Sequence, residues 1–506
     1  MNKINCKIKR YLLLLMLYAT PVGLSGQSGI LTVHSDGLTA LMAKDAVLQE
    51  GLKPYRIEPA KAFWVENRTD SNRLFTWKLS VARRGLYKVN LLLNMPGERP
   101  DEDRRISVEL AVNGKKTVRE IVAFPYWERH SLEQTVELAG GDNTLSLGLA
   151  PVSGTGHTLQ LYSVELIRPQ VERQMEKRAA RLQRRPQWFS DAGYGFFFHW
   201  NSKSMPRRGD AGSYTEAVDA FDVAAFAETV HDCGADFIIF TTTWAEYYFP
   251  APLQSIDKIL PGRTARRDLI YDLSTELSKY GIKLMLYYHL GHGDPEWWDR
   301  QGFRSPDAGN LFTNLQEITG EISLRYKDRV AGLFLDDGMI YYPHNAPFED
   351  ITKAAKKGNR DMVVSYNCWI FPQLTLFQDY YTGENGISME TAKAWDWAID
   401  NAGYFTSGPQ TGLRATFCGL LEPGDWAHLP KDTDIPPPLF TSEQLTEIVR
   451  TAMARRNVPV MNVSVYRDGS ISPETFRLLK ELNHAVHAKR HSPVLDSTNA
   501  AQSGLR

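Results

Sequence analysis

The stretch Val330-Ala331-Gly332-Leu333-Phe334-Leu335-Asp336-Asp337-Gly338 decides which fold this chain is expected to adopt. It is a short apolar run without a helical period and is bounded by glycine, which predicts a buried strand. Two carboxylates, Asp336 and Asp337, stand where that strand ends. In a (β/α)₈ barrel the catalytic groups lie at the C-terminal ends of the strands, so an acid there is a catalytic candidate. The alternative is that these aspartates only end the strand in a turn.

Strands and helices alternate around this stretch, over residues 187–490. Further strands are expected at Gly195–Trp200, Phe237–Thr243, Lys283–His289 and Met362–Tyr366, and helices at Val223–Val230, Asp268–Tyr280 and Asn314–Tyr326. This alternation predicts a parallel sheet, and the length favours a (β/α)₈ barrel. The segment from about Val458 either completes the barrel or forms a small C-terminal β extension, and Thr475–His487 is expected to be the last helix.

Residues 30–169 have a different pattern, of short alternating strands separated by turns such as Asn113-Gly114. Regular short strands without helices predict an antiparallel β-sandwich. The runs at 85–89, 112–115 and 141–145 resemble the jelly-roll carbohydrate-binding modules that are attached to glycosidases. A sandwich that only braces the next domain is the alternative. Residues 170–186 are expected to form a charged helical linker that ends before Pro186.

The N-terminal residues 1–26 have the features of a secretory signal peptide. A basic segment precedes the apolar run Tyr11–Ala19, and small residues follow it. The run is too short for stable insertion into a membrane. We therefore expect an exported protein, periplasmic or secreted, and we expect residues 491–506 to form a disordered tail.

The composition excludes some classes of function. The 58 Lys and Arg residues are balanced by 59 Asp and Glu residues, so no overall field favours a nucleic-acid partner. Cys233, Cys368 and Cys418 remain after the leader, with spacing that supports neither a disulfide framework nor a structural zinc site. His289, His292 and Asp294 carry donors suited to a metal, but their spacing does not demand one. The oligomeric state is left open.

Polar side chains follow several of the predicted barrel strands, and two carboxylates among them could act as a pair. Hydrolysis of a glycoside needs one carboxyl group that attacks or activates water and another that protonates the leaving oxygen. Asp336 and Glu384 can form that pair if the loop that carries Glu384 folds over the barrel mouth. Glu390 is the alternative proton donor.

A set of motifs in chain order points to one family. The motifs are Phe196–Trp200 (FFFHW), Asp232–Thr243, Arg267–Leu269, Leu286–Tyr288, Pro295–Trp298, Leu333–Gly338, Met362–Trp369, Tyr381–Glu384, Met389-Glu390, Ala402–Tyr404 and Val460–Gly469. Over about residues 188–482 the chain resembles the α-L-fucosidases of glycoside hydrolase family 29.

The resemblance implies a retaining mechanism, an oligosaccharide or glycoconjugate substrate and no cofactor. It places Asp336 at the family's nucleophile and Glu384 where the acid/base commonly lies, with Glu390 as a competitor. His199 falls on a histidine that hydrogen-bonds the sugar. The predicted substrate-binding residues are His199, Trp200, Trp244, Glu246, His289, Asn367 and Trp369.

Some positions depart from the family pattern. Thr243–Tyr247 stands where the family has a Lys-His-His-Asp-Gly run, so both sugar-binding histidines are absent, and Cys368 replaces an arginine. Each lost contact removes roughly 1–3 kcal/mol of recognition. The substrate is therefore an α-L-fucoside or a related sugar. A glycan-binding protein that has lost catalysis is the second hypothesis.

Overall fold

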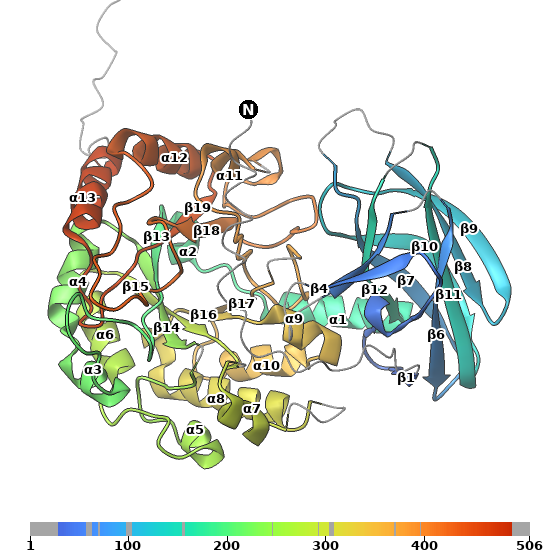
Figure 1. Ribbon diagram of the computed structural model, residues 1–506, viewed down its shortest axis with the longest axis horizontal. Coiled ribbons are helices and arrows are strands. Elements are labelled where there is room, and N and C mark those ends of the chain that lie inside the picture. Colours follow the sequence, from blue (N-terminus) through green and yellow to red (C-terminus); the bar gives the residue numbers. More distant parts are fainter. Residues whose placement is uncertain are drawn as a thin grey trace, which may run out of the picture. The chain divides into compact units, whose positions relative to one another are not determined.

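The computed structural model describes residues 29–56, 63–68, 71–97, 104–153, 157–244, 246–291, 293–302, 308–368, 371–394 and 396–487. The chain divides into two compact units, Met1–Arg173 and Gln174–Arg506 (Figure 1). The predicted signal peptide and the predicted disordered tail lie outside the described residues. None of the described helices is long and apolar enough to cross a membrane.

The N-terminal unit is built from two sheets that share one apolar core. One sheet has the strand order β1-β6-β11-β8-β9 with β3 beside β6, and the other has the order β10-β7-β12-β5-β4 with β2 beside β12. The strands are β1 (Ile30–Val33), β2 (Thr39–Met42), β3 (Val47–Leu48), β4 (Leu52–Arg56), β5 (Phe63–Asn67), β6 (Arg73–Val81), β7 (Gly85–Asn94), β8 (Arg105–Val112), β9 (Lys115–Val122), β10 (Glu128–Leu138), β11 (Gly141–Pro151) and β12 (Leu159–Ile167), with the short helix η2 (Ala43–Asp45). Apart from the parallel pair β1–β6, the pairings are antiparallel, which confirms the antiparallel sheets predicted here.

Alternation along these strands explains the shared core. In β6 the side chains of Phe75, Trp77 and Leu79 are buried, while Lys78 between them is exposed. The residue period of a strand is two, so such a pattern turns one face inward. Strand β9 lies at a sheet edge and has the charged sequence KKTVREIV, and charge on an edge strand protects against unwanted pairing.

The C-terminal unit contains a parallel sheet in its described residues, with the order β17-β16-β15-β14-β13-β19-β18. Its strands are β13 (Gly195–Phe198), β14 (Phe237–Thr243), β15 (Lys283–Tyr288), β16 (Gly332–Leu335), β17 (Val363–Tyr366), β18 (Thr416–Leu420) and β19 (Val458–Asn462). Strand β14 is buried along its whole length, as expected for a strand covered on both faces.

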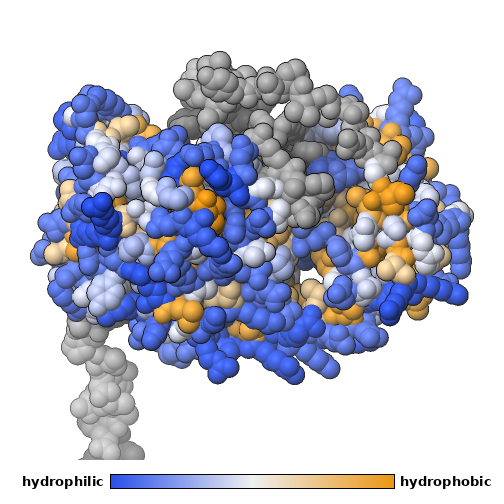
Figure 2. Space-filling model, turned by 90° about the horizontal axis from the view of Figure 1, so that it is seen from below, coloured by the Kyte–Doolittle hydropathy of each residue, from blue (hydrophilic) through white to orange (hydrophobic). Residues whose placement is uncertain are grey.

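Helices surround this sheet (Figure 1). They are α2 (Gln187–Asp191), α3 (Tyr214–Ala220), α4 (Val223–Asp232), α5 (Gln254–Ile259), α6 (Leu269–Ser278), α7 (Pro295–Arg300), α8 (Leu311–Tyr326), α9 (Gly338–Tyr341), α10 (Phe348–Ala355), α11 (Met389–Lys393), α12 (Ser442–Ala454) and α13 (Pro473–His487), with the short helices η3 (Lys327–Arg329), η4 (Tyr342–His344) and η5 (Asp396–Ala398). Helix α1 (Pro169–Leu182) begins in the first unit and ends in the second. Aspartate side chains cap α4 and α6, where Asp222 and Asp268 accept from backbone N–H groups. On the face shown in Figure 2, hydrophilic residues predominate and hydrophobic residues form separate patches.

Two sequence predictions need correction. Val458–Asn462 is strand β19 and lies between β13 and β18 within the parallel sheet, so of the two alternatives left open for this segment, the separate C-terminal β extension is excluded. The helical linker was expected over residues 170–186 and to end just before Pro186, whereas α1 begins at Pro169 and ends at Leu182. Proline at the first helical position loses no hydrogen bond and has a φ suited to the helix.

An irregular segment, residues 379–383, connects the two edge strands of the parallel sheet. On one side, the Asp379 N–H donates to Val364 O of β17 at 2.7 Å. On the other side, the Cys418 N–H of β18 donates to Gly383 O at 2.7 Å. One apolar core contains inward side chains of all seven strands together with Tyr380 of this segment. Because the strands are parallel, their C-terminal ends lie at the same end of this core.

Candidate active site

Asp336 follows β16 directly, and its carboxylate is held from three sides. Oδ2 accepts from the Tyr287 hydroxyl at 2.5 Å, while Oδ1 accepts from the Asp337 backbone N–H at 2.8 Å and from Asn367 Nδ2 at 2.9 Å. Burial, followed by the negative charge of Asp336, raises the pKa of Tyr287 well above 10. Tyr287 therefore stays protonated and remains a donor to this carboxylate.

Asn367 connects the two predicted catalytic carboxylates. Its Nδ2 donates to Asp336 Oδ1 at 2.9 Å and to Glu384 Oε2 at 3.0 Å. Because both oxygens bond the same nitrogen, they lie at most about 5.9 Å apart, the sum of the two lengths. Asn367 is 4% exposed, so its amide is held firmly between the two acids. The predicted pair is thus brought together by a third predicted residue.

Asp337 faces away from this pair. Its φ of 70° is left-handed, and its Oδ2 lies 3.2 Å from His289 Nε2 and accepts from the Leu290 N–H at 3.2 Å. His289 Nδ1 accepts from the Gly291 N–H at 2.9 Å, so in neutral histidine the proton is on Nε2, directed to Asp337. His289, predicted to bind substrate, is 2% exposed and supports the loop after β16 through this contact.

The left-handed turn at Asp337 depends on the glycine that follows it. A Cβ on Gly338 would lie 2.3 Å from Asn367 O and 2.9 Å from Cys368 Cβ. The Gly338 N–H donates to that same Asn367 O at 2.8 Å. Glycine is required here because the chain after β16 and the chain after β17 approach each other by their backbones.

His199 follows β13 and lies among aromatic rings. Its ring centroid is 5.0 Å from that of Tyr287, 5.3 Å from Trp244 and 5.1 Å from Trp426. Its Nδ1 bonds Asn462 Oδ1 at 2.7 Å, and because Asn462 Nδ2 donates to Trp426 O, the proton of this bond comes from His199. Burial lowers the pKa of His199 to about 3. Its Nε2 is therefore an acceptor for a hydroxyl group.

The other predicted substrate-binding residues lie in different environments. Trp200 is fully buried, donates its indole N–H to Arg467 O at 2.9 Å and packs on Phe221, so its described contacts are structural and its role in substrate binding stays a prediction. His199, the residue before Trp200, faces the site, and adjacent side chains of an extended chain point to opposite faces, so Trp200 points the other way. Glu246 bonds Ser202 Oγ at 3.2 Å and is half exposed. Trp369 lies outside the described residues, as does His292.

Glu384 and Glu390, the competing acid/base candidates, lie in different environments. Glu384 is half-buried and shares Asn367 with Asp336, whereas Glu390 is exposed in the first turn of α11. No hydrogen bond connects Glu390 to Asp336 within the described residues. The geometry favours Glu384 over Glu390.

Tyr287, Trp426 and Asn462 were not predicted as site residues. Tyr287 is the next inward position after Met285 on β15, so the strand period contained a signal for it. Trp426 lies in the long loop after β18, and β18 itself was not predicted. Asn462 ends β19, and its position became clear only once that strand was placed beside β13.

Two of the positions that depart from the family pattern, Tyr247 and Cys368, hold buried side chains. Tyr247 is fully buried, stacks on Trp297 with ring centroids 3.5 Å apart and hydrogen-bonds the Tyr288 hydroxyl. Cys368 is buried at 4% exposure. Asp294 caps α7 and pairs with Arg263 at 2.8 Å. Among the described residues no group of three or more His, Cys, Asp and Glu side chains is arranged to hold a metal ion.

The chain matches no family model and no curated protein. Among solved structures it is similar to the endo-fucoidan hydrolase MfFcnA4 of glycoside hydrolase family 107, with 15% identity over 61% of this chain and 54% of that chain and a TM-score of 0.46. It is also similar to the Thermotoga maritima α-fucosidase with a mechanism-based inhibitor, with 15% identity over 61% and 75% of the two chains and a TM-score of 0.41. It is similar as well to a fucosyltransferase mutant of the α-L-fucosidase AlfC, with 16% identity over 62% of this chain and 100% of that chain and a TM-score of 0.43.

All three neighbours are glycoside hydrolases or derived from one by name, and the match spans only about half of MfFcnA4. Identities this low and TM-scores below 0.5 assign neither a family nor an activity to this chain. The functional assignment therefore has to come from the residues of the site.

Proposed function

We propose that this chain is an exported retaining glycosidase that releases α-L-fucose or a related sugar from glycans. The observation that carries the proposal is the bridge from Asn367 Nδ2 to Asp336 Oδ1 and Glu384 Oε2. It brings two carboxylates together at the C-terminal ends of parallel strands, where barrel enzymes carry their chemistry.

The separation of the two carboxylates supports a retaining mechanism. Retaining glycosidases hold their carboxyl groups about 5–5.5 Å apart, and inverting enzymes hold them about 6.5–9.5 Å apart to admit a water molecule. The upper limit of about 5.9 Å between Asp336 Oδ1 and Glu384 Oε2 lies below the inverting range.

In the proposed first step Asp336 attacks the anomeric carbon. Within the described residues Oδ2 accepts one hydrogen bond, from Tyr287, while Oδ1 accepts two, so Oδ2 has the lone pair available for attack. The bond from the anomeric carbon to the leaving oxygen breaks, and Glu384 gives its proton to that oxygen. In the second step Glu384 takes a proton from water, whose oxygen attacks the anomeric carbon and releases Asp336.

His199 and the aromatic rings beside it are proposed to bind the sugar. Its neutral imidazole accepts a hydrogen bond from a sugar hydroxyl at Nε2. The indole rings of Trp244 and Trp426 stack on the apolar side of the sugar ring. The Trp244 position, where the resembled family has histidine, favours stacking over hydrogen bonding. The alternative, a glycan-binding protein without catalysis, is supported by the same replacement of histidine by Trp244 and by Cys368 in place of an arginine.

Two further parts of the proposal concern fold and export. The parallel sheet is proposed to close as a (β/α)₈ barrel in which residues 379–383 take the place of the eighth strand, because they bond to both edge strands. Export is proposed from the basic and apolar pattern of residues 1–26, and N-terminal sequencing of the secreted protein tests it.

The function is tested with aryl α-L-fucosides beside a panel of other aryl glycosides, using wild type and Asp336→Asn, Glu384→Gln and Glu390→Gln. Release of fucose that both Asp336→Asn and Glu384→Gln abolish, with Glu390→Gln close to wild type, is the expected result. If another glycoside is cleaved instead, again only when Asp336 and Glu384 are present, the proposed mechanism holds and the proposed sugar is replaced. Glycan binding without any cleavage would move the binding-protein alternative forward.

A further inference from the structure

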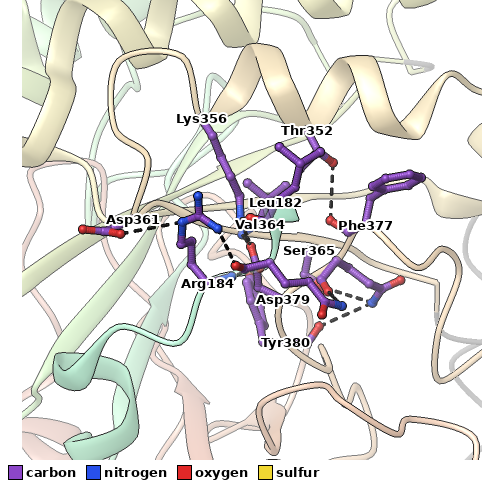
Figure 3. Close-up of polar contacts among 12 residues, drawn as sticks. Leu182, Arg184, Thr352, Lys356, Asp361, Val364, Ser365, Phe377, Asp379 and Tyr380 are labelled. Carbon is purple, nitrogen blue, oxygen red and sulfur yellow. Dashed lines mark hydrogen bonds and ion pairs between the residues drawn. The ribbon is translucent and has the colours of Figure 1, made fainter. Parts of the chain in front are cut away.

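A buried ion pair lies at the start of the segment 379–383, which directly precedes Glu384. Lys356 Nζ and Asp379 Oδ2 are 2.6 Å apart, and their side chains are 5% and 1% exposed. Asp379 Oδ2 also accepts from the Val364 N–H at 2.8 Å, and Oδ1 accepts from the Arg184 N–H at 2.9 Å. Figure 3 shows these groups converging from β17 and from the chain that follows α1.

Lys356 connects two more parts of the chain. It follows α10, and its Nζ donates to Leu182 O at the end of α1 at 2.8 Å as well as to Asp379. Burial lowers the pKa of Lys356 and raises that of Asp379, while each group's charge acts on the other in the opposite direction. The N–H donors around Asp379 favour its ionised form, so we assign the pair as ionised.

The segment above this pair has little regular structure to fix it. Besides those to Val364 and Cys418, its bonds include Ser365 Oγ of β17 to Tyr380 O at 2.5 Å and the Tyr381 N–H to the O of Arg414, which precedes β18, at 3.0 Å. Gly383 has φ 55°, and a Cβ there would lie 2.4 Å from Thr416 O. Glu384 is the next residue, so the position of its carboxyl group depends on how the segment 379–383 is seated, that is, fixed against β17 and β18.

Stability alone does not account for such a pair. Replacing a buried ion pair by apolar residues is often neutral or stabilising, whereas removing one partner leaves an uncompensated charge. Here the pair joins the start of the irregular segment to α1, α10 and β17. About five residues separate Asp379 from Glu384, which is roughly 16 Å of extended chain. Any effect on Glu384 is therefore transmitted through the seating of the segment.

We propose that Lys356 and Asp379 are positioning residues that seat the segment 379–383 and so hold the Glu384 carboxyl beside Asn367 and Asp336. The inference rests on the proposed role of Glu384 as acid/base. It assigns a catalytic consequence to a pair that makes no contact with the substrate.

The variants are Asp379→Asn, Lys356→Met and the two combined. Each single change leaves one buried partner without its counter-charge, and the combined change removes both charges while Asn can still accept from Val364. The combined variant therefore keeps the test valid if a single variant fails to fold. The control is Lys480→Met, which makes the same substitution in the more exposed Lys480–Asp232 pair of 2.9 Å between α13 and α4, away from the segment.

The first readout compares an aryl α-L-fucoside that has a good leaving group, dinitrophenyl, with one that has a poor leaving group, phenyl. Departure of phenoxide needs the proton from Glu384, whereas dinitrophenoxide leaves without it. For the combined variant we expect kcat/KM to fall at least about tenfold more for the phenyl substrate, because a misplacement near 1 Å can cost about 100-fold. Equal losses for both substrates, or none, would overturn the proposal.

The second readout needs no activity. Hydrogen exchange is measured at the N–H groups of Cys418 and Gly386, which bond to Gly383 O and Cys418 O. We expect at least tenfold faster exchange at these two groups in the combined variant and unchanged exchange there in Lys480→Met. Unchanged or uniformly faster exchange in the combined variant contradicts the seating role. If wild type cleaves neither fucoside, the proposed fucosidase activity fails, and the exchange result still decides on the pair.

Discussion

The substitution Tyr287→Phe removes one oxygen atom from the site and tests how Asp336 is held. The phenol donates to Asp336 Oδ2 at 2.5 Å, and the ring is 2% exposed between Phe197 and Phe334. A hydrogen bond to a charged group contributes about 1.5–3 kcal/mol. At about 1.4 kcal/mol for each factor of ten, the loss of alignment should lower kcat/KM by about 10- to 150-fold.

Steady-state hydrolysis of the substrate identified by the glycoside panel measures this effect, with thermal unfolding as a check on the fold. Tyr288→Phe is the matched control, because Tyr288 is the next residue of β15, is equally buried and hydrogen-bonds Tyr247 instead of a carboxylate. We expect its kcat/KM to stay within about threefold of wild type. A Tyr287→Phe variant with wild-type activity, or equal losses in both variants, would refute the reasoning.

Three further predictions concern neighbouring residues. The pKa of His199, about 3, lies below its unfolded value near 6.5, so the unfolded state binds the proton first and the wild-type protein loses stability as pH drops from about 6.5 towards 3. In denaturant unfolding, the stability of His199→Gln relative to wild type should therefore rise by about 2 kcal/mol between pH 8 and pH 5. The same difference between the two proteins at both pH values contradicts this. Trp244→Ala should raise KM about tenfold with little change in kcat, as initial rates will show, whereas an unchanged KM would remove Trp244 from the sugar site. Gly338→Ala should destabilise the fold by about 1–3 kcal/mol and displace Asn367. In the control Gly320→Ala the new Cβ would meet only Ala354 Cβ at 3.8 Å, so the fold should become about 0.5–1 kcal/mol more stable. Thermal melts of both variants measure these changes.

Much of the fold could be predicted because the apolar runs of the strands are unambiguous. Phe237–Thr243 was predicted with the bounds that the structure shows, since an unbroken apolar run ends there in threonines. The helix start near Asp268 was also predictable, because aspartate caps the first free N–H groups. The place of Val458–Asn462 was left open, because sequence gives a strand's existence but not its neighbours.

The site was predictable where a side chain follows a recognised strand. Asp336, Asn367 and His199 each do, and all three face the same area. Trp200 shows the limit, because a shift of one residue along an extended chain turns a side chain to the opposite face. Trp426 and the Lys356–Asp379 pair could not be predicted, since their partners come from segments far apart in the chain.

The most direct test of the central claim is to trap the proposed glycosyl-enzyme. The Glu384→Ala variant is mixed with dinitrophenyl α-L-fucoside, quenched within the first turnover, digested and examined by mass spectrometry. The leaving group departs without acid help, but hydrolysis of the ester lacks its base, so the intermediate should accumulate. The account predicts one fucosyl unit on Asp336. A fucosyl unit on Asp337 or another residue, or phenol release with no labelled peptide, would contradict it.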